Sequence, residues 1–155
     1  VLMKTQKFPA DVHARVLVVD DHPTTATTLA RAISLLGPGI EAVIASTGEQ
    51  AFEMVKEHPV DVLITDMIMP GINGLQLVET LRALPEICPA YIIVITAYEI
   101  PDLEKAAQKL SVNDVLLKPV RPDWICQLIA SAIAHLTGQV GARPSAPPQN
   151  KHTSG

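Results

Sequence analysis

The chain has 155 residues, of which 48% are hydrophobic and 18% are charged, and its formal net charge is −4. This composition indicates one globular domain with its own core and excludes a disordered chain; the negative charge gives no reason to expect direct binding of nucleic acid. No apolar run approaches the roughly 20 residues that span a bilayer, and residues 1–10 lack the apolar stretch of a secretory signal. We therefore expect a cytoplasmic protein without membrane contact.

In chain order, short runs rich in Val and Ile alternate with segments of helical periodicity. The runs predict buried parallel strands at residues 15–20, 40–45, 60–65, 91–95 and 114–117. The helical patterns that follow them cover residues 24–36, 47–57, 74–84, 102–110 and 122–137. The 102–110 segment carries mostly small or polar side chains, so we expect this helix to pack most weakly.

Local signals mark the ends of two of these helices. Residues 37–39 (GPG) end the first helix, since Gly suits a helix C-terminus and Pro cannot continue one. The second helix opens at Ser46 or Thr47, and Glu49 and Gln50 stand where a capping box needs a carboxylate or amide side chain.

Five βα units joined by short connections predict an α/β fold with a single doubly wound, five-stranded parallel sheet. We expect the flavodoxin-like strand order 2-1-3-4-5, which places the carboxyl ends of the first and third strands side by side. The domain is predicted to cover residues 14–137. An N-terminal extension (1–13) precedes it, and a flexible tail or linker rich in Gly, Pro and Ser (138–155) follows it.

Polar side chains follow the predicted strands at their carboxyl ends, which meet at one rim in such a sheet. Asp20 ends the first strand, Asp21 comes directly after it, and Asp66 follows the third. Thr96 and Lys118 follow the fourth and fifth strands. Each residue alone has an ordinary structural interpretation, as a helix cap, a turn residue, a strand former or a solvated charge. The combination is more specific, because it gathers three carboxylates, a hydroxyl and an ammonium group.

The three carboxylates at this rim repel one another, and two such charges ~4 Å apart cost about 4 kcal/mol at an effective dielectric constant near 20. A divalent cation would offset the repulsion, and Mg²⁺ prefers oxygen ligands and readily shares a phosphate oxygen. A carboxylate held against such a cation can attack phosphorus to form an aspartyl-phosphate. Lys118 and Thr96 could then supply positive charge and a hydrogen-bond donor to the transferred group.

Four segments now make the chain resemble a known family, the receiver (phosphoacceptor) domain of two-component response regulators, over about residues 14–137. The segments, in order, are 18–23 (VVDDHP), 61–74 (DVLITDMIMPGING), 94–97 (VITA) and 116–119 (LLKP). The resemblance implies the same five-stranded α/β fold. It also implies a phosphorelay function in which the domain accepts a phosphoryl group from a histidine kinase.

The resemblance assigns the metal and acceptor roles by position. Asp66 matches the phosphoacceptor. Asp20 and Asp21 match the acidic pair that holds Mg²⁺, one directly and one through water, and Ile68 matches the residue whose backbone carbonyl reaches the metal. His22, beside the acidic pair, is interpreted as a loop residue that flanks the site.

The resemblance also assigns the residues that read the phosphoryl group. Thr96 matches the switch hydroxyl, and Lys118 matches the lysine that pairs with phosphate, followed by Pro119 with a peptide that is commonly cis in the family. Two positions depart from the pattern. Val115 stands where Tyr or Phe commonly acts as a rotamer switch, and Ser111 stands where Gly is frequent.

Two bulky residues flank the expected phosphoryl position. Ile68 lies two residues after Asp66, and Tyr98 lies two residues after Thr96. Neither side chain can orient a water molecule as an acid or an amide does, so we predict slow self-dephosphorylation.

The leading hypothesis is therefore a signalling domain rather than an enzyme; it would catalyse only its own phosphorylation and slow dephosphorylation. Its expected partners are a sensor histidine kinase or phosphotransfer protein, and an output domain or a downstream protein. Phosphorylation is expected to change the surface formed by the fourth helix, fifth strand and fifth helix. A homodimer through that surface is an open alternative to a monomer.

Three other functions remain open at this point. A Mg²⁺-dependent phosphatase could use a similar sheet, but adjacent Asp20 and Asp21 do not match the spacing of two residues usual in such enzymes, and no insertion could cover a substrate. A flavin-binding protein of this fold would need a phosphate-cradling loop where residues 20–23 are acidic. A pseudo-receiver that binds partners without phosphorylation is favoured only by Val115.

Overall fold

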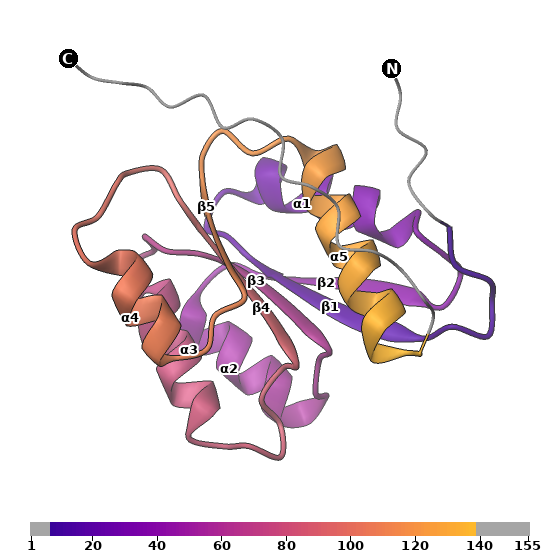
Figure 1. The fold of residues 1–155 in the computed structure, drawn as a ribbon, viewed down its shortest axis with the longest axis horizontal. Coiled ribbons are helices and arrows are strands. Elements are labelled where there is room, and N and C mark those ends of the chain that lie inside the picture. Colours follow the sequence, from indigo (N-terminus) through magenta and orange to yellow (C-terminus); the bar gives the residue numbers. More distant parts are fainter. Residues whose placement is uncertain (1–6, 139–155) are drawn as a thin grey trace.

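The computed structural model describes residues 7–138, in which a five-stranded parallel sheet is flanked by five helices (Figure 1). The strands are β1 Ala14–Val19, β2 Ile40–Ala45, β3 Val62–Asp66, β4 Tyr91–Thr96 and β5 Asp114–Leu117. The helices are α1 Pro23–Ser34, α2 Gly48–Glu57, α3 Gly74–Arg82, α4 Leu103–Lys109 and α5 Pro122–Leu136. No helix in this part of the chain is both long and apolar enough to span a membrane. Nearly all of the predicted 138–155 tail lies outside the described residues.

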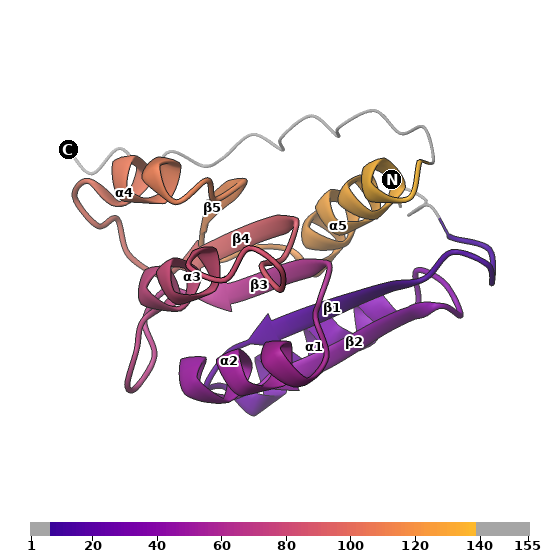
Figure 2. The same cartoon turned by 90° about the horizontal axis from the view of Figure 1, so that it is seen from below.

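The strand order across the sheet is β2-β1-β3-β4-β5, and each neighbouring pair is parallel. Figure 2 shows this succession, with β2 at one edge of the sheet and β5 at the other. The doubly wound, flavodoxin-like fold predicted from the sequence is therefore confirmed. All ten predicted elements are present, and their ends differ from the prediction by at most two residues.

The sheet separates two apolar layers, because successive side chains of a strand point to opposite faces. In β1, Val16 and Val18 pack in the layer beneath α1 and α5, whereas Leu17 and Val19 pack in the layer beneath α2, α3 and α4. Figure 1 shows these two groups of helices on opposite sides of the sheet. Both faces are thus covered, which leaves the carboxyl ends of the strands as the place where polar side chains gather.

The core extends into the segment before β1 that we assigned to an N-terminal extension. Phe8 and Val12 are buried against the α1–α5 layer, and the Phe8 N–H donates to the carbonyl of Leu36 at 2.5 Å. Gly37 lies so close to Phe8 that a β-carbon there would be 2.8 Å from the Phe8 carbonyl oxygen. Leu36 is itself buried, and α1 ends at Ser34 rather than at residue 36 as the chain turns to place Leu36 in the core.

The start of α2 differs in one respect from the predicted capping box. Thr47 is the N-cap and accepts from the Gln50 N–H at 3.0 Å, as expected. The Gln50 side chain, however, accepts from the backbone N–H and the hydroxyl of Ser46, which together offer it two donors. Glu49 reaches in another direction and accepts from the Ile72 N–H in the β3–α3 loop.

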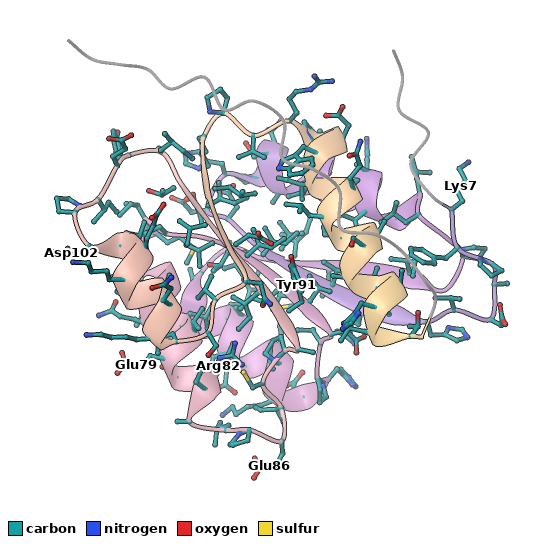
Figure 3. All side chains as sticks on the ribbon, in the orientation of Figure 1. Lys7, Glu79, Arg82, Glu86, Tyr91 and Asp102 are labelled. Carbon is teal, nitrogen blue, oxygen red and sulfur yellow. The ribbon has the colours of Figure 1, made fainter. Side chains whose placement is uncertain are left out.

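Helix α4 is the shortest of the helices in the described residues, and of its seven residues only Leu103 and Ala107 are buried, which agrees with the weak packing expected for it. The turn after it is tied to α3 by Arg82, whose guanidinium donates to the carbonyls of Leu110 and Ser111, each at 2.7 Å (Figure 3). Ser111 has a φ of 56°, a left-handed backbone conformation that Gly adopts at lower cost. This geometry gives a physical reason for the glycine that the resemblance leads one to expect at that position.

Candidate functional site

The three aspartates at the carboxyl rim come together through the pairing of β1 with β3. Val19 is in register with Thr65, so the residues that follow, Asp20 and Asp66, lie side by side. One ligand atom each from Asp20, Asp21, Asp66 and the neighbouring His22 all lie within 4.8 Å of one another. The structure thus brings together all three carboxylates that the sequence analysis placed at one rim.

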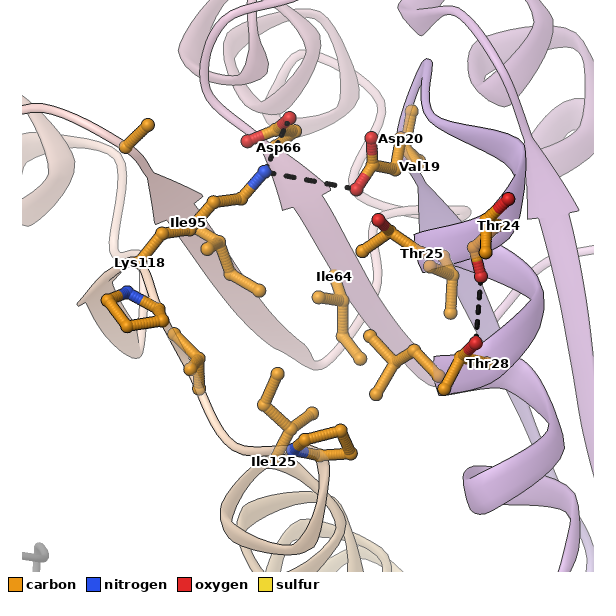
Figure 4. A pocket seen from close by; sticks show the side chains of 16 residues that line it. Val19, Asp20, Thr24, Thr25, Thr28, Ile64, Asp66, Ile95, Lys118 and Ile125 are labelled. Carbon is orange, nitrogen blue, oxygen red and sulfur yellow. Dashed lines mark hydrogen bonds and ion pairs between the residues drawn. The ribbon is translucent and has the colours of Figure 1, made fainter.

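Lys118 enters this cluster from the end of β5 (Figure 4). Its ammonium nitrogen lies 3.1 Å from Oδ2 of Asp66, to which it donates a hydrogen bond, and 4.0 Å from Oδ2 of Asp20. The Lys118–Pro119 peptide is cis, as the resemblance implied. One ammonium group therefore contacts two of the three carboxylates, those of Asp66 and Asp20.

The electrostatics of the cluster favour an added positive charge. Asp20 and Asp66 are buried, and burial raises the pKa of Asp66 above its ordinary value; the Lys118 hydrogen bond and charge lower it, and the neighbouring charges of Asp20 and Asp21 raise it. Oδ1 of Asp21 is buried and accepts no hydrogen bond of good geometry, although Nδ1 of His22 lies 3.2 Å from it. A set of closely spaced carboxylates matches the oxygen ligands that a hard divalent cation prefers.

His22 lies closer to the acidic group than a merely flanking residue would. Its Nδ1 is 3.1 Å from Oδ1 of Asp20 and 3.2 Å from Oδ1 of Asp21, while the ring remains 68% exposed. Its backbone N–H also donates to Oδ1 of Asp20 at 2.9 Å. The sequence signal for this contact was only its position next to the acidic pair, at the entrance to α1.

The hydroxyl of Thr96 points into its own loop. Thr96 is buried at the end of β4, where it donates to the Tyr98 carbonyl at 2.9 Å and accepts from the Tyr98 N–H at 3.3 Å. The sequence placed Thr96 at the same rim as Asp66 but could not predict this orientation. The hydroxyl would have to leave the Tyr98 carbonyl before it could donate to a group on Asp66.

Beside Thr96, a cavity of about 380 Å³ lies between the β4–α4 loop, α4 and β5, and Val115 and Leu117 form part of its wall. Val115 is only partly buried, and Tyr98 at the rim is 68% exposed. Ile68, in the β3–α3 loop, has 53% of its surface exposed. Both bulky residues that we expected to flank the phosphoryl position thus reach into solvent.

A second cavity, of about 630 Å³, is lined in part by Asp66 and Lys118 (Figure 4). It lies between α1 and the β5–α5 connection, with threonine hydroxyls at its edge and a mainly apolar floor. The threonines and the floor residues are Thr24, Thr25, Thr28, Ile64, Ile95 and Ile125. The site is therefore approachable from the α1 side of the sheet.

The sequence matches the family model described as the response regulator receiver domain over residues 16–130. This match covers most of the part of the chain that the structure describes, and it includes the acidic residues, Thr96 and Lys118. The chain belongs to the response regulator receiver domain family, which acts in two-component signalling.

Two similar proteins illustrate this membership. The virulence sensor protein BvgS of Bordetella pertussis is 35% identical over 129 residues, which make up 79% of this chain and 10% of that protein. A Rhizobium etli protein described as chemotaxis protein CheY is 33% identical over 105 residues, 68% of this chain and 81% of that protein. The chain thus spans about a tenth of the length of the BvgS proteins and most of the length of the CheY protein.

Solved structures agree on the fold. The N-terminal domain of a Wolinella succinogenes protein superposes with a TM-score of 0.71 at 29% identity, covering 80% of this chain and 96% of that chain. The chemotaxis protein CheY4 of Vibrio cholerae superposes with a TM-score of 0.69 at 22% identity, covering 77% and 98% of the two chains.

Proposed function

We propose that this receiver domain accepts a phosphoryl group on Asp66 in a Mg²⁺-dependent reaction and thereby switches its α4-β5-α5 surface. The observation that supports the proposal most strongly is the cluster of Asp20, Asp21 and Asp66 within 4.8 Å, with the Lys118 ammonium 3.1 Å from Asp66. Three crowded carboxylates and one lysine suit a site that receives a cation and a phosphoryl group.

In the transfer step, a carboxylate oxygen of Asp66 attacks the phosphorus of the donor. A bond forms between that oxygen and phosphorus, and the bond from phosphorus to the donor's leaving atom breaks. The leaving atom is a nitrogen of phosphohistidine or an oxygen of an acyl phosphate, and it departs with the electron pair. Asp66 must be ionised to act in this way, and Lys118 is placed to hold it ionised and then to donate to an oxygen of the transferred group.

The carboxylates of Asp20, Asp21 and Asp66 and the backbone carbonyl of Ile68 are the groups that would hold Mg²⁺. These groups offer only oxygen atoms, and the three carboxylates lie close enough together to share one ion, which fits Mg²⁺. Bound Mg²⁺ would supply positive charge that offsets the carboxylates and the phosphoryl oxygens. His22 would remain at the exposed edge, where its Nδ1 contacts both Asp20 and Asp21.

We infer that the switch acts through the Thr96 hydroxyl. A phosphoryl group on Asp66 adds about 1.5 to 2 negative charges and strong acceptors. Thr96 would exchange its bond to the Tyr98 carbonyl for one to the phosphoryl group, which releases the β4–α4 loop. Helix α4, with two buried residues, can move at low cost, so the α4-β5-α5 surface would respond even though Val115 lacks a ring.

The partners we propose are a sensor histidine kinase or phosphotransfer protein as donor, and an output domain or downstream protein as receiver of the signal. The cavity of about 630 Å³ beside Asp66 leaves room for a donor protein to approach from α1. We propose residues 14–137 as the receiver domain, with 138–155 as a tail or linker and 1–13 as an N-terminal extension whose Phe8 and Val12 pack into the domain's core. A homodimer through α4-β5-α5 and a cytoplasmic location are further expectations.

The proposal is tested by incubating the protein with acetyl phosphate and Mg²⁺ and measuring its intact mass. We expect a gain of one phosphoryl group that disappears when EDTA replaces Mg²⁺. No mass gain in Mg²⁺ would contradict the proposal and favour a pseudo-receiver that signals without phosphorylation. Sustained turnover of a small phosphate ester would instead point to a phosphatase.

A further inference from the structure

Glu49, in the first turn of α2, bonds to the loop that follows the acceptor residue. Its Oε1 accepts from the backbone N–H of Ile72 at 3.0 Å, although the two residues are 23 positions apart in the sequence. The pKa of Glu49 is lowered, chiefly by this bond, which is consistent with a charge-assisted interaction. The phosphorylation and switching proposed for the domain do not involve this contact.

The contact is closely fitted on both sides. Gly71, next to Ile72, has a φ of 81°, and a β-carbon there would come within 2.5 Å of Oε1 of Glu49. On the helix side, a β-carbon at Gly48 would overlap the Ile72 side chain. Two glycines thus make room for the bond between Glu49 and the loop, and one of them adopts a backbone conformation that suits glycine.

The loop held in this way runs directly from the metal and acceptor site. Asp66 ends β3, and the chain then passes through Ile68 to the α3 N-cap, Asn73. The first end of the loop is fixed because the Met67 N–H donates to the Ile95 carbonyl at 2.7 Å, and the last because Asn73 forms a capping box. Glu49 fastens the stretch between these two anchors.

We infer that Glu49 is a positioning residue for the metal site: by fixing Ile72 it holds the β3–α3 loop so that the Ile68 carbonyl remains within reach of a cation bound by the aspartates. The inference rests on the proposed function, because it needs Mg²⁺ at the cluster. Glu49 itself touches neither the aspartates nor Lys118, so it acts only through the loop.

The test compares Mg²⁺ binding, measured by isothermal titration calorimetry, in wild type, Glu49→Ala, Glu49→Gln and Glu53→Gln. Glu53 is the matched control, since it lies on the same helix and its removal changes the charge equally, but it pairs with Lys56 and not with the loop. We expect Glu49→Ala to bind Mg²⁺ about tenfold more weakly, the low end for partners that orient metal ligands. Glu49→Gln, which keeps an acceptor, should lose less, and Glu53→Gln should match wild type.

A second readout needs no metal. Hydrogen exchange of the Ile72 amide in metal-free protein should be faster in Glu49→Ala than in wild type and unchanged in Glu53→Gln. Faster exchange combined with unaltered Mg²⁺ affinity would overturn the inference, because the bond would then serve only to join α2 to the loop. If wild type itself bound no Mg²⁺, the proposed function would be contradicted. If wild type bound Mg²⁺ and Glu49→Ala bound it equally well, only the role of Glu49 would be contradicted.

Discussion

The ammonium nitrogen of Lys118 lies 3.1 Å from Oδ2 of Asp66, so a hydrogen-bonded ion pair joins the carboxyl ends of β5 and β3. The pair only partly stabilises the buried carboxylate, because the pKa of Asp66 remains above its ordinary value. Burial and the charges of Asp20 and Asp21 outweigh the lysine. The site is therefore short of positive charge when no cation is present, and this shortage has measurable consequences.

The first consequence concerns stability. A carboxyl group with a pKa higher in the folded than in the unfolded protein favours folding below its unfolded pKa, and this contribution is lost as the pH rises through the folded pKa. Asp66→Asn removes the ionised form, so in metal-free buffer at neutral pH we expect a higher free energy of unfolding for the variant than for wild type. The difference should shrink as the pH falls through the raised pKa of Asp66 in the folded protein, and it should be gone below about 4, the ordinary pKa of an Asp side chain in an unfolded chain.

Urea denaturation at several pH values measures this difference, with Asp11→Asn, at an exposed position away from the site, as the control for lost charge. Added Mg²⁺ should stabilise wild type more than Asp66→Asn. An Asp66→Asn variant less stable than wild type at neutral pH without metal would contradict our description of the site.

The lifetime of the phosphorylated form follows from the residues at the rim. Ile68 and Tyr98 carry neither a carboxylate nor an amide that would orient a water molecule for attack, so we predict decay over minutes or longer, and faster decay in Ile68→Asn, which adds an amide. Loss of the phosphoryl group in Mg²⁺ buffer is followed by intact mass, with Leu35→Asn as an exposed control outside the site. A wild-type half-life of seconds would show that the exposed rim residues do not exclude water.

The turn after α4 offers a test of backbone strain. Ser111 has a φ of 56°, and this left-handed conformation costs a residue with a β-carbon roughly 1–2 kcal/mol. Glycine avoids this cost, but it also has more conformational freedom to lose from the unfolded chain, which offsets part of the gain in stability. Ser111→Gly should therefore raise the free energy of unfolding by about 0.5–1 kcal/mol. Ser111→Ala, which loses the hydroxyl but keeps the β-carbon, should give no such gain in the same urea titration.

The segment before β1 is predicted to contribute to the fold. Phe8 is 3% exposed, and replacing a buried Phe by Ala typically costs about 3–5 kcal/mol. We expect Phe8→Ala to lower the free energy of unfolding by about 3 kcal/mol, whereas Lys7→Ala at the neighbouring exposed position should change it by less than about 0.5 kcal/mol. A loss below about 1 kcal/mol for Phe8→Ala would show that this segment is dispensable for folding.

The sequence predicted the fold well because its signals are local and repeated. Val/Ile runs such as 91–95 are buried on both faces, and parallel strands require this pattern. The short connections indicate a doubly wound sheet, and the flavodoxin-like strand order expected for it brings Asp20 beside Asp66. The positions of the aspartates and Lys118 at the ends of the predicted strands were thus enough to predict that these side chains meet at one rim of the sheet.

Other features depend on contacts between segments that are distant in the sequence, and no local sequence pattern predicts them. The periodicity of the chain does not reveal that Phe8 packs against the end of α1, or that Glu49 bonds to Ile72 instead of completing a cap. The direction of the Thr96 hydroxyl depends on the rotation of its side chain. That rotation is determined by whether the nearest acceptor is the Tyr98 carbonyl, as in this structure, or a phosphoryl group.

The central claim is that Asp66 is the phosphoacceptor of this receiver domain. The most direct measurement is the intact mass of wild type and Asp66→Asn after incubation with acetyl phosphate and Mg²⁺, followed by peptide mapping of any modified protein. We predict one phosphoryl group on wild type, located at Asp66, and none on Asp66→Asn. An unmodified wild type, or equal modification of both proteins, would contradict the claim.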